Sequence, residues 1–320
     1  MIGELRRAAP LDQALDAVRT EGLSKSFGAL RAVERLDLEI PQGRFFGLLG
    51  PNGSGKTTTI HMLATLIRPT AGTAVVAGHD VRAEPVAVRR AIGLVFQESA
   101  LDRSLTVDEN LQLTAALHDL PPRLVRGRID ELLALFGLAE KRRAPVGSLS
   151  GGMRRALDII RGILHRPRVL FLDEPTIGLD VLNRRAIWRY IERLRQQEAI
   201  TVLLTTHYLE EAEGCDRVAF LSRGRLIGSG TPQQLIRALG AYVLELEGGA
   251  QEAISTHLMP QLGAPLQDGD RLSFRIPSED FPLEELHREL RSRVRNLRIH
   301  RPDLNDVYVW LNSGMWDGSR

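Results

Sequence analysis

The chain has one cysteine, Cys215, among its 320 residues, and aromatic residues make up only 5% of it. A single cysteine cannot form a disulfide within the chain, and this usage is typical of a protein in a reducing compartment. Nowhere do 18 apolar residues follow one another, so the sequence predicts no membrane-spanning helix. Residues 1–17 carry charges and no apolar run, and we therefore expect no signal peptide. If the protein acts at a membrane, another chain must cross it.

The chain also lacks a strong excess of charge. Its 42 basic and 40 acidic residues leave a formal net charge of +2. The arginines are spread along the chain, so we expect no nucleic-acid partner. A hydrophobic content of 43% is ordinary for a globular protein, and 320 residues are long enough for two domains.

One stretch carries the clearest chemistry. Residues 50–57 read GPNGSGKT and fit the phosphate-binding pattern G-x-x-x-x-G-K-[ST] at every fixed position. The apolar run 45–49 before it predicts a buried strand, and apolar residues at helical spacing follow over 58–66. The predicted order is therefore strand, glycine loop and helix. The candidate nucleotide-binding residues are Gly50, Pro51, Asn52, Gly53, Ser54, Gly55, Lys56, Thr57 and Thr58.

This order of elements points backbone N–H groups and a positive helix end at one place, where a polyphosphate such as that of ATP would bind. Glycines allow the loop to bend sharply and approach the phosphate. We expect Lys56 to reach the β- and γ-phosphates and to serve catalysis, and the Thr57 hydroxyl to hold Mg²⁺.

Two carboxylates follow a second buried strand. The apolar run 169–172 leads directly into Asp173 and Glu174. In an open α/β sheet, ligands bind beyond the carboxyl ends of the strands. We expect Asp173 to help coordinate Mg²⁺ and Glu174 to act as the general base that polarises the attacking water.

Three further positions have a plain structural interpretation beside the functional one. His207 follows the buried strand predicted over 201–206 and could hydrogen-bond a γ-phosphate. Phe27, next to a glycine turn, could stack on an adenine ring or belong to the core, and spacing alone favours neither. Ser150 begins an amphipathic helix after a helical region that starts near residue 98. Taken alone, the sequence Ser150-Gly151-Gly152 is better explained as helix capping than as an anion site.

Beyond about residue 240 the pattern changes. Alternating strands are predicted over 241–246, 271–276 and 294–300, with helices near 252–258 and 283–293 and a last helix after Pro302-Asp303. This arrangement indicates a small α+β domain of 239–320, in which no catalytic constellation is visible.

In this order, the motifs resemble those of the ATPase subunit of an ABC transporter. GPNGSGKT resembles the Walker A motif, Leu149-Ser150-Gly151-Gly152 the ABC signature and Leu170–Glu174 Walker B with its catalytic glutamate. Gln97 resembles the Q-loop glutamine, and Gly178-Leu179-Asp180 resembles the D-loop. His207 resembles the switch histidine, and Phe27 falls where the family has its adenine-stacking aromatic. Met153 departs from the family, since many members carry glutamine there.

The resemblance covers about residues 17–235 and is nearest to the daunorubicin-resistance type of exporter ATPase. It implies an α/β fold, with a P-loop ABC ATPase core of mixed sheet and helices over 17–238. A helical subdomain would occupy about 98–165, and residues 1–16 would be an extension. It implies ATP and Mg²⁺ as cofactors, with Gln97 beside Thr57 and Asp173 as metal ligands and Asp180 at the nucleotide.

The family resemblance also implies partners. Two ATPase domains would face each other head to tail, so that Ser150, Gly151 and Gly152 of one contact the ATP held by Walker A of the other. One chain carries one set of motifs, which implies a homodimer or a partner ATPase. Movement would pass to separate membrane-spanning permease subunits, which places the chain at the cytoplasmic side of the cell membrane, where it would drive export of a drug, antibiotic or lipid-like substrate.

Three alternatives remain. A soluble ABC ATPase acting on ribosomes or DNA would usually carry two cassettes or long coiled coils, and neither is visible. An importer ATPase with a regulatory C-terminal domain is a second alternative. A non-hydrolysing, ATP-dependent clamp is disfavoured because Glu174 and His207 are both present.

Overall fold

The computed structural model describes residues 16–197 and 200–316, so residues 1–15 of the predicted N-terminal extension lie outside the described part. The contacts divide the chain into two units, which are described separately. The first comprises the residues up to Phe45 together with Thr57–Leu204. The second comprises Phe46–Lys56 and Thr205–Arg320.

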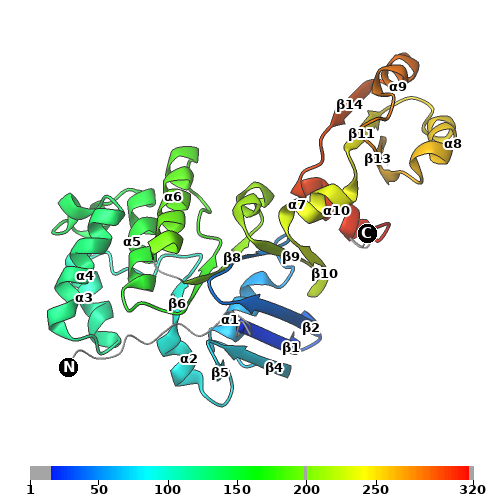
Figure 1. The fold of residues 1–320 in the computed structure, drawn as a ribbon. Helices are drawn as coiled ribbons and strands as arrows, with labels where there is room; N and C mark the ends of the chain where they lie inside the picture. The colour runs from blue at the N-terminus through cyan, green and yellow to red at the C-terminus, as the bar shows by residue number, and fades with distance from the viewer. Residues whose placement is uncertain (1–15, 198–199, 317–320) are drawn as a thin grey trace, which may run out of the picture. The chain divides into compact units, whose positions relative to one another are not determined.

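The first unit begins with an antiparallel sheet of order β2-β1-β4-β5 (Figure 1). Its strands alternate between buried and exposed residues, as expected for a sheet with one face in the core. The short β5 was not predicted. The strands are β1 (Asp16–Phe27), β2 (Leu30–Pro41), β4 (Ala71–Val76) and β5 (His79–Asp80).

Parallel strands form the central part of this unit. β6 (Ile92–Val95) pairs in parallel with β7 (Val169–Asp173), and β8 (Thr201–Thr206) follows β7 in the sheet order. All five residues of β7 and all six of β8 are buried, as apolar runs in a parallel sheet predict. Two helices of this unit are α1 (Lys56–Leu63) and α2 (Pro85–Ala91).

The predicted helical region contains α3, α4 and α5, which lie side by side (Figure 1). A capping box begins α3, since Thr106 accepts a hydrogen bond from the Glu109 N–H and the Glu109 side chain accepts one from the Thr106 N–H. The sequence analysis assigned no element to α6, whose buried residues are only three. The helices are α3 (Val107–Leu117), α4 (Pro122–Leu135), α5 (Gly151–Ile163) and α6 (Val181–Gln197), with short 3₁₀ turns at Ala139–Lys141 and Val146–Ser148.

The second unit contains β3 (Phe45–Leu49), which pairs in parallel with β9 (Arg217–Ser222). β10 (Arg225–Gly230) pairs antiparallel with β9 in a hairpin. Gly47 of β3 packs tightly, because a Cβ there would lie 3.1 Å from the sulfur of buried Cys215. A 3₁₀ turn (Leu209–Gly214) and α7 (Pro232–Leu239) complete this part. Helix α7 is capped by Thr231, whose side chain accepts a hydrogen bond from the Gln234 N–H.

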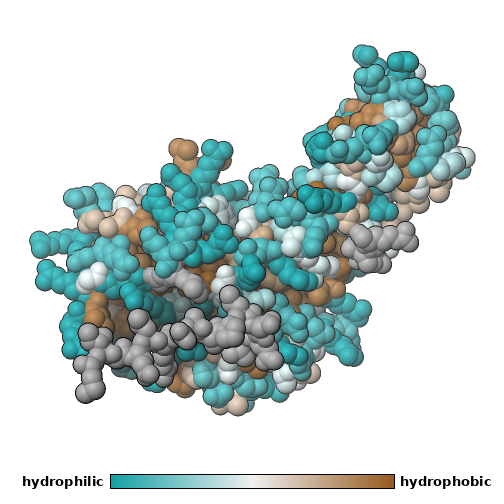
Figure 2. Space-filling view, in the orientation of Figure 1, coloured by the Kyte–Doolittle hydropathy of each residue, from teal (hydrophilic) through white to brown (hydrophobic). Residues whose placement is uncertain are grey.

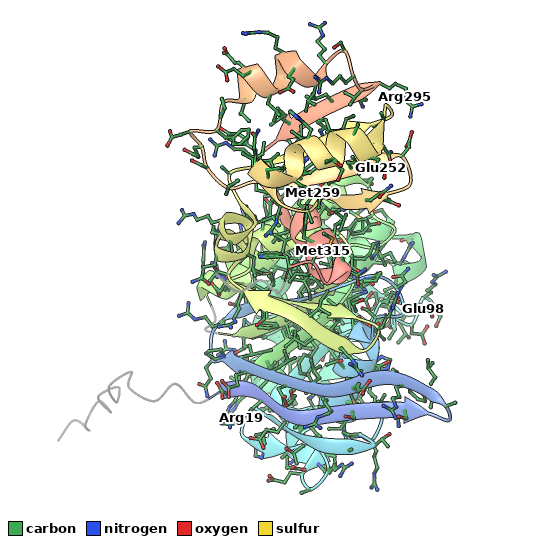
Figure 3. All side chains as sticks on the ribbon, turned by 90° about the vertical axis from the view of Figure 1, so that its right-hand side faces the viewer. Arg19, Glu98, Glu252, Met259, Arg295 and Met315 are labelled. Carbon is green, nitrogen blue, oxygen red and sulfur yellow. The ribbon has the colours of Figure 1, made fainter. Side chains whose placement is uncertain are left out.

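The C-terminal segment folds as the predicted α+β arrangement, a sheet of order β12-β13-β11-β14 with its own apolar core. The short strand β12 was not predicted. The charged side chains labelled on it, such as Glu252 and Arg295, point outward (Figure 3). The elements are β11 (Tyr242–Glu247), α8 (Gln251–Leu262), β12 (Leu266–Asp268), β13 (Arg271–Ile276), α9 (Leu283–Leu290), β14 (Asn296–His300) and α10 (Leu304–Ser313).

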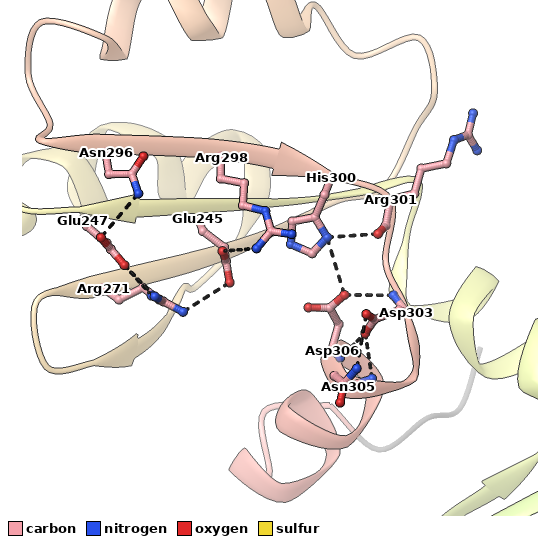
Figure 4. Close-up of polar contacts among 10 residues, drawn as sticks. All are labelled: Glu245, Glu247, Arg271, Asn296, Arg298, His300, Arg301, Asp303, Asn305 and Asp306. Atoms are coloured by element: carbon pink, nitrogen blue, oxygen red, sulfur yellow. Dashed lines mark hydrogen bonds and ion pairs between the residues drawn. The ribbon is translucent and has the colours of Figure 1, made fainter. Parts of the chain in front are cut away.

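Charges are paired across the strands of this sheet (Figure 4). Glu247 lies directly opposite Arg271, which donates to its carboxylate at 2.5 and 3.0 Å. Glu245 lies opposite Arg298 on the other side, at 3.9 Å. Opposite charges at facing positions favour this strand register over a shifted one.

The last helix is capped by two aspartates. Asp303 accepts hydrogen bonds from the backbone N–H groups of Asn305 and Asp306, and Asp306 accepts one from the Asp303 N–H at 2.9 Å (Figure 4). Burial raises the pKa of Asp306 from 3.8 to about 6. The folded domain therefore favours the protonated carboxyl group of Asp306.

The surface seen in Figure 2 is mostly hydrophilic, with hydrophobic side chains in separate patches. Within residues 16–197 and 200–316, no helix combines the length and the hydropathy that a membrane crossing requires.

We expect the raised pKa of Asp306 to make the C-terminal domain less stable as the pH rises from about 4 to about 6, because in this range the folded state binds more protons than the unfolded state. The variant Asp306→Asn stays neutral and should lose less stability over this range. Urea unfolding followed by tryptophan fluorescence, at pH 4.5 and 7, measures the difference. Trp188→Phe in both proteins would leave Trp310 and Trp316 as reporters. Equal pH dependence in the two proteins would contradict the prediction.

Candidate functional site

The phosphate loop has the bent backbone that its glycines predict. Gly50, Gly53 and Gly55 have φ values of +150°, +80° and +108°, which side chains with a Cβ rarely adopt. At Gly50 a Cβ would also lie 2.3 Å from the Leu221 carbonyl oxygen, so no larger residue fits. The Gly224 N–H donates to the Ser54 carbonyl oxygen at 3.0 Å, which ties the loop to the β9–β10 turn.

Polar groups of the loop are buried. Lys56 is 4% exposed, and its ammonium group donates to the carbonyl oxygens of Gly50 and Pro51 at 2.8 and 3.2 Å. The Ser54 hydroxyl is buried, with no hydrogen-bond partner among the described residues. A buried polar atom without a partner costs about 1–3 kcal/mol, so this loop suits a ligand that supplies acceptor oxygens. Pro51, Asn52 and Gly53 are exposed.

Two of the three predicted magnesium-binding side chains, those of Thr57 and Asp173, lie together. The Thr57 hydroxyl, at the start of α1, donates to a carboxylate oxygen of Asp173, at the end of β7, at 3.1 Å. Thr57 and Thr58 are half-buried, and Asp173 is 1% exposed. Within the described residues no cluster of three or more histidine, cysteine or acidic side chains is placed to hold a metal. One carboxylate and one hydroxyl are the donor types that Mg²⁺ accepts beside waters and phosphates.

Glu174 has an unusual backbone. Its φ is +46°, in the left-handed region, and its side chain is buried at 6% exposure. A residue with a Cβ adopts this conformation at a cost of about 1–3 kcal/mol, and such residues cluster at functional sites. The conformation turns the chain directly after β7, where the sequence predicted the general base.

The signature motif begins α5 as predicted. Ser150 is exposed and accepts a hydrogen bond from the Met153 N–H at 3.3 Å. Gly151 is also exposed, whereas Gly152 is buried against α6, because a Cβ there would lie 2.2 Å from the Asn183 side-chain oxygen.

The predicted D-loop aspartate caps α6. Exposed Asp180 accepts hydrogen bonds from the Asn183 backbone and side chain at 2.9 and 2.6 Å. These bonds lower the pKa of Asp180 and keep its carboxylate charged. The same Asn183 therefore contacts both the signature helix and the D-loop, a role that the sequence analysis missed.

The remaining predicted residues lie as follows. Gln97 follows β6 and is exposed, as is Glu98 after it (Figure 3). Phe27, at the end of β1, is 51% exposed, and the Lys25 ammonium lies 5.0 Å from its ring centre. An exposed ring is available for stacking, whereas a core residue would be buried. In the second unit, half-buried His207 lies 4.0 Å from the Tyr208 ring, measured between ring centres.

Sequence reasoning also missed Arg155. It is buried on the inner face of α5, and its guanidinium donates to the carbonyl oxygens of Phe96, Asp173, Glu174 and Pro175. Burial lowers its pKa from the ordinary arginine value. One sequence signal was present, since Arg155 lies three residues after Gly152 and four before Ile159, on the buried face.

Comparisons with known proteins agree with this geometry. A family model described as "ABC transporter" matches residues 33–177. A daunorubicin/doxorubicin resistance ATP-binding protein of Streptomyces peucetius is 41% identical over 93% of both chains. The chain belongs to the ABC transporter family. It is an ABC-type ATP-binding protein, and ATP hydrolysis is its activity.

Other relatives cover between about two thirds and nine tenths of this ABC ATPase. A Nod factor export ATP-binding protein I of Ralstonia nicotianae is 40% identical over 91% of this chain and 92% of its own. A solved dimeric ATP-binding cassette in a post-hydrolysis state, bound to ADP and Pi, has a TM-score of 0.61 and 26% identity. It covers 67% of this chain and 98% of its own. The ATP-binding subunit of an ABC transporter has a TM-score of 0.63 and 28% identity, covering 69% and 92%. These cassettes confirm the predicted α/β ABC fold.

The contact between Gly152 and Asn183 generates a prediction. We expect Gly152→Ala to destabilise the protein by about 1–3 kcal/mol, because the added methyl group overpacks the contact between α5 and α6. Gly151→Ala is the matched control, since its Cβ would lie 4.0 Å from Leu179. Thermal unfolding measures both. A melting temperature of Gly152→Ala equal to that of Gly151→Ala would show that the contact is not tight.

Proposed function

We propose that this ABC ATPase is the energy-coupling subunit of an exporter, binding and hydrolysing ATP between two copies of itself. The observation that carries the proposal is the hydrogen bond between Thr57 and Asp173. Thr57 directly follows, in the sequence, a phosphate loop of the required conformation. The residue roles below are parts of this proposal.

ATP would be held by residues 50–58, with its phosphates at the loop N–H groups and near Lys56. The buried Ser54 hydroxyl without a described partner supports this fit, because a phosphate oxygen would accept its hydrogen bond. Mg²⁺ would be held by Thr57, Asp173 and Gln97, and when bound it would offset negative charge on the phosphates. The adenine would stack on Phe27.

Hydrolysis would depend on Glu174 as the general base for the attacking water. Its left-handed backbone and buried side chain support this role, because they fix the direction in which the carboxylate leaves β7. Lys56 would stabilise the negative charge that develops on the transferred phosphoryl group, and His207 would donate a hydrogen bond to it.

The proposed dimer explains the exposed end of α5. Ser150 and Gly151 lie at the surface, with the helix N-terminus and its positive dipole end. A second copy would place its Walker A-bound ATP at Ser150, Gly151 and Gly152, with Asp180 beside it. The dimeric solved cassettes support this arrangement. ATP would close the dimer, and hydrolysis would release it.

The export role rests on the names of the relatives, which concern daunorubicin, doxorubicin and Nod factor. We therefore propose a drug-like, antibiotic or lipid-like substrate that passes through a separate integral-membrane permease, with this chain on the cytoplasmic face. The domain boundaries that we propose are 1–16, 17–238 with a helical subdomain at about 98–165, and 239–320.

We expect Glu174→Gln to bind ATP while its turnover falls by about 100-fold or more, because the general base is lost but the charge-independent contacts remain. The variant should accumulate as an ATP-bound dimer in size-exclusion chromatography with ATP and Mg²⁺. Glu284→Gln, the same change at an exposed acid, is the control. A Glu174→Gln protein that stays monomeric and keeps full turnover would refute the proposed site.

We expect Phe27→Ala to raise the KM for ATP by roughly tenfold with little change in kcat, because stacking on a base contributes about 1–3 kcal/mol. Leu30→Ala is the control, since Leu30 is the register partner of Phe27 and is also exposed. Initial rates of phosphate release at varied ATP concentration measure both. If the two variants have the same KM, Phe27 does not contact the base.

A further inference from the structure

Arg155 holds the end of β7 by three hydrogen bonds. Its Nε donates to the Pro175 carbonyl oxygen at 2.5 Å, and one terminal nitrogen donates to those of Asp173 and Glu174 at 3.2 and 3.1 Å. The guanidinium is planar and rigid, so these bonds fix three successive carbonyl groups in one geometry. The three carbonyls flank the left-handed turn at Glu174 on both sides.

The other terminal nitrogen of Arg155 donates to the Phe96 carbonyl oxygen, directly before Gln97. Further along α5, Arg161 donates to the Ala100 carbonyl oxygen at 2.7 Å. Helix α5 therefore holds the Q-loop segment at two points. Arg155 is the side chain that joins this segment to Glu174.

The position of Glu174 depends on this arginine for a physical reason. A left-handed conformation of a residue with a Cβ persists only where its surroundings stabilise it. Four of the five guanidinium N–H donors are accounted for by backbone carbonyls. A lysine has a single nitrogen with three donors and cannot reach all four carbonyls in this planar arrangement.

We propose that Arg155 is a positioning residue that couples the signature end of α5 to Glu174 and Gln97 of the same chain. This inference rests on the proposed dimer. Ser150 begins the helix about 7.5 Å before Arg155 along its axis, at 1.5 Å per residue. A shift of α5 that follows contact between Ser150 and the ATP held by the partner subunit would reach the chain's own hydrolytic site through Arg155. The two ATP sites of the dimer would then respond to each other.

The test compares Arg155→Lys with Arg154→Lys in the full-length chain. Arg154 is the neighbouring arginine on α5, and the one hydrogen bond of its side chain within residues 16–197 and 200–316 goes to the Leu149 carbonyl oxygen. Three measurements are made on each protein: the melting temperature, the Kd for ATP, and phosphate release as a function of ATP concentration. We expect Arg155→Lys to keep its melting temperature within a few degrees and its Kd within twofold. Its kcat should fall tenfold or more, and its Hill coefficient should fall to 1 from a value above 1 in Arg154→Lys.

Two outcomes would overturn the proposal. The first is a kcat and a Hill coefficient of Arg155→Lys that equal those of Arg154→Lys. The second is a loss of ATP binding or of the melting transition in Arg155→Lys, because it would make the role of Arg155 purely structural. Failure of the dimer itself is separately visible, since Glu174→Gln would then remain monomeric with ATP whatever residue occupies position 155.

Discussion

The hydrogen bond from the Thr57 hydroxyl to Asp173 is the constraint on which the nucleotide site depends. It joins the start of α1 to the end of β7, which are 116 residues apart in the chain. Both groups are of the kind that binds Mg²⁺, and the bond brings together two of the side chains that we propose as metal ligands. This contact and the hydrogen bonds from Arg155 together hold the turn that follows Asp173.

Several residues of the candidate site have a backbone conformation or a small size that their positions require. Gly50, Gly53 and Gly55 adopt positive φ values in the loop, and Gly152 leaves room for Asn183. Glu174 adopts a positive φ without being a glycine, and its carboxylate is the general base of the proposed mechanism. Hydrogen bonds from buried Arg155 to the carbonyl oxygens of residues 173–175 offset the cost of this conformation. They hold the turn in one geometry, which a flexible turn would not have.

The fold was predictable from the sequence wherever the signal was local. The phosphate loop, the buried runs of β7 and β8 and the strand at Arg271–Ile276 agree with the structure because each depends on a few neighbouring residues. Helix α6 was missed because its sequence is rich in arginine and only Ile187, Ile191 and Leu194 are buried. The short strands β5 and β12 are set by pairing with distant strands rather than by their own sequence.

The residues of the candidate site also fall into those that local sequence patterns indicate and those that only the fold reveals. Lys56, Thr57 and Asp173 could be selected from the sequence because a glycine loop and a carboxylate after a buried strand are local patterns, and their roles stay predictions. Arg155 and Asn183 were not, because their roles arise from contacts between segments that only the fold brings together. Placement of His207 against the other catalytic groups stays a prediction.

The burial of Cys215 beside Gly47 has a practical consequence for spectroscopy. Cys215 is the only native thiol in the chain, and water-borne reagents have little access to it. A cysteine engineered at a solvent-facing position such as Leu182, which is 77% exposed, would therefore be the one thiol that a spin label or fluorophore modifies readily. Distances between the two copies of the proposed dimer could then be followed through the catalytic cycle without first replacing the native cysteine.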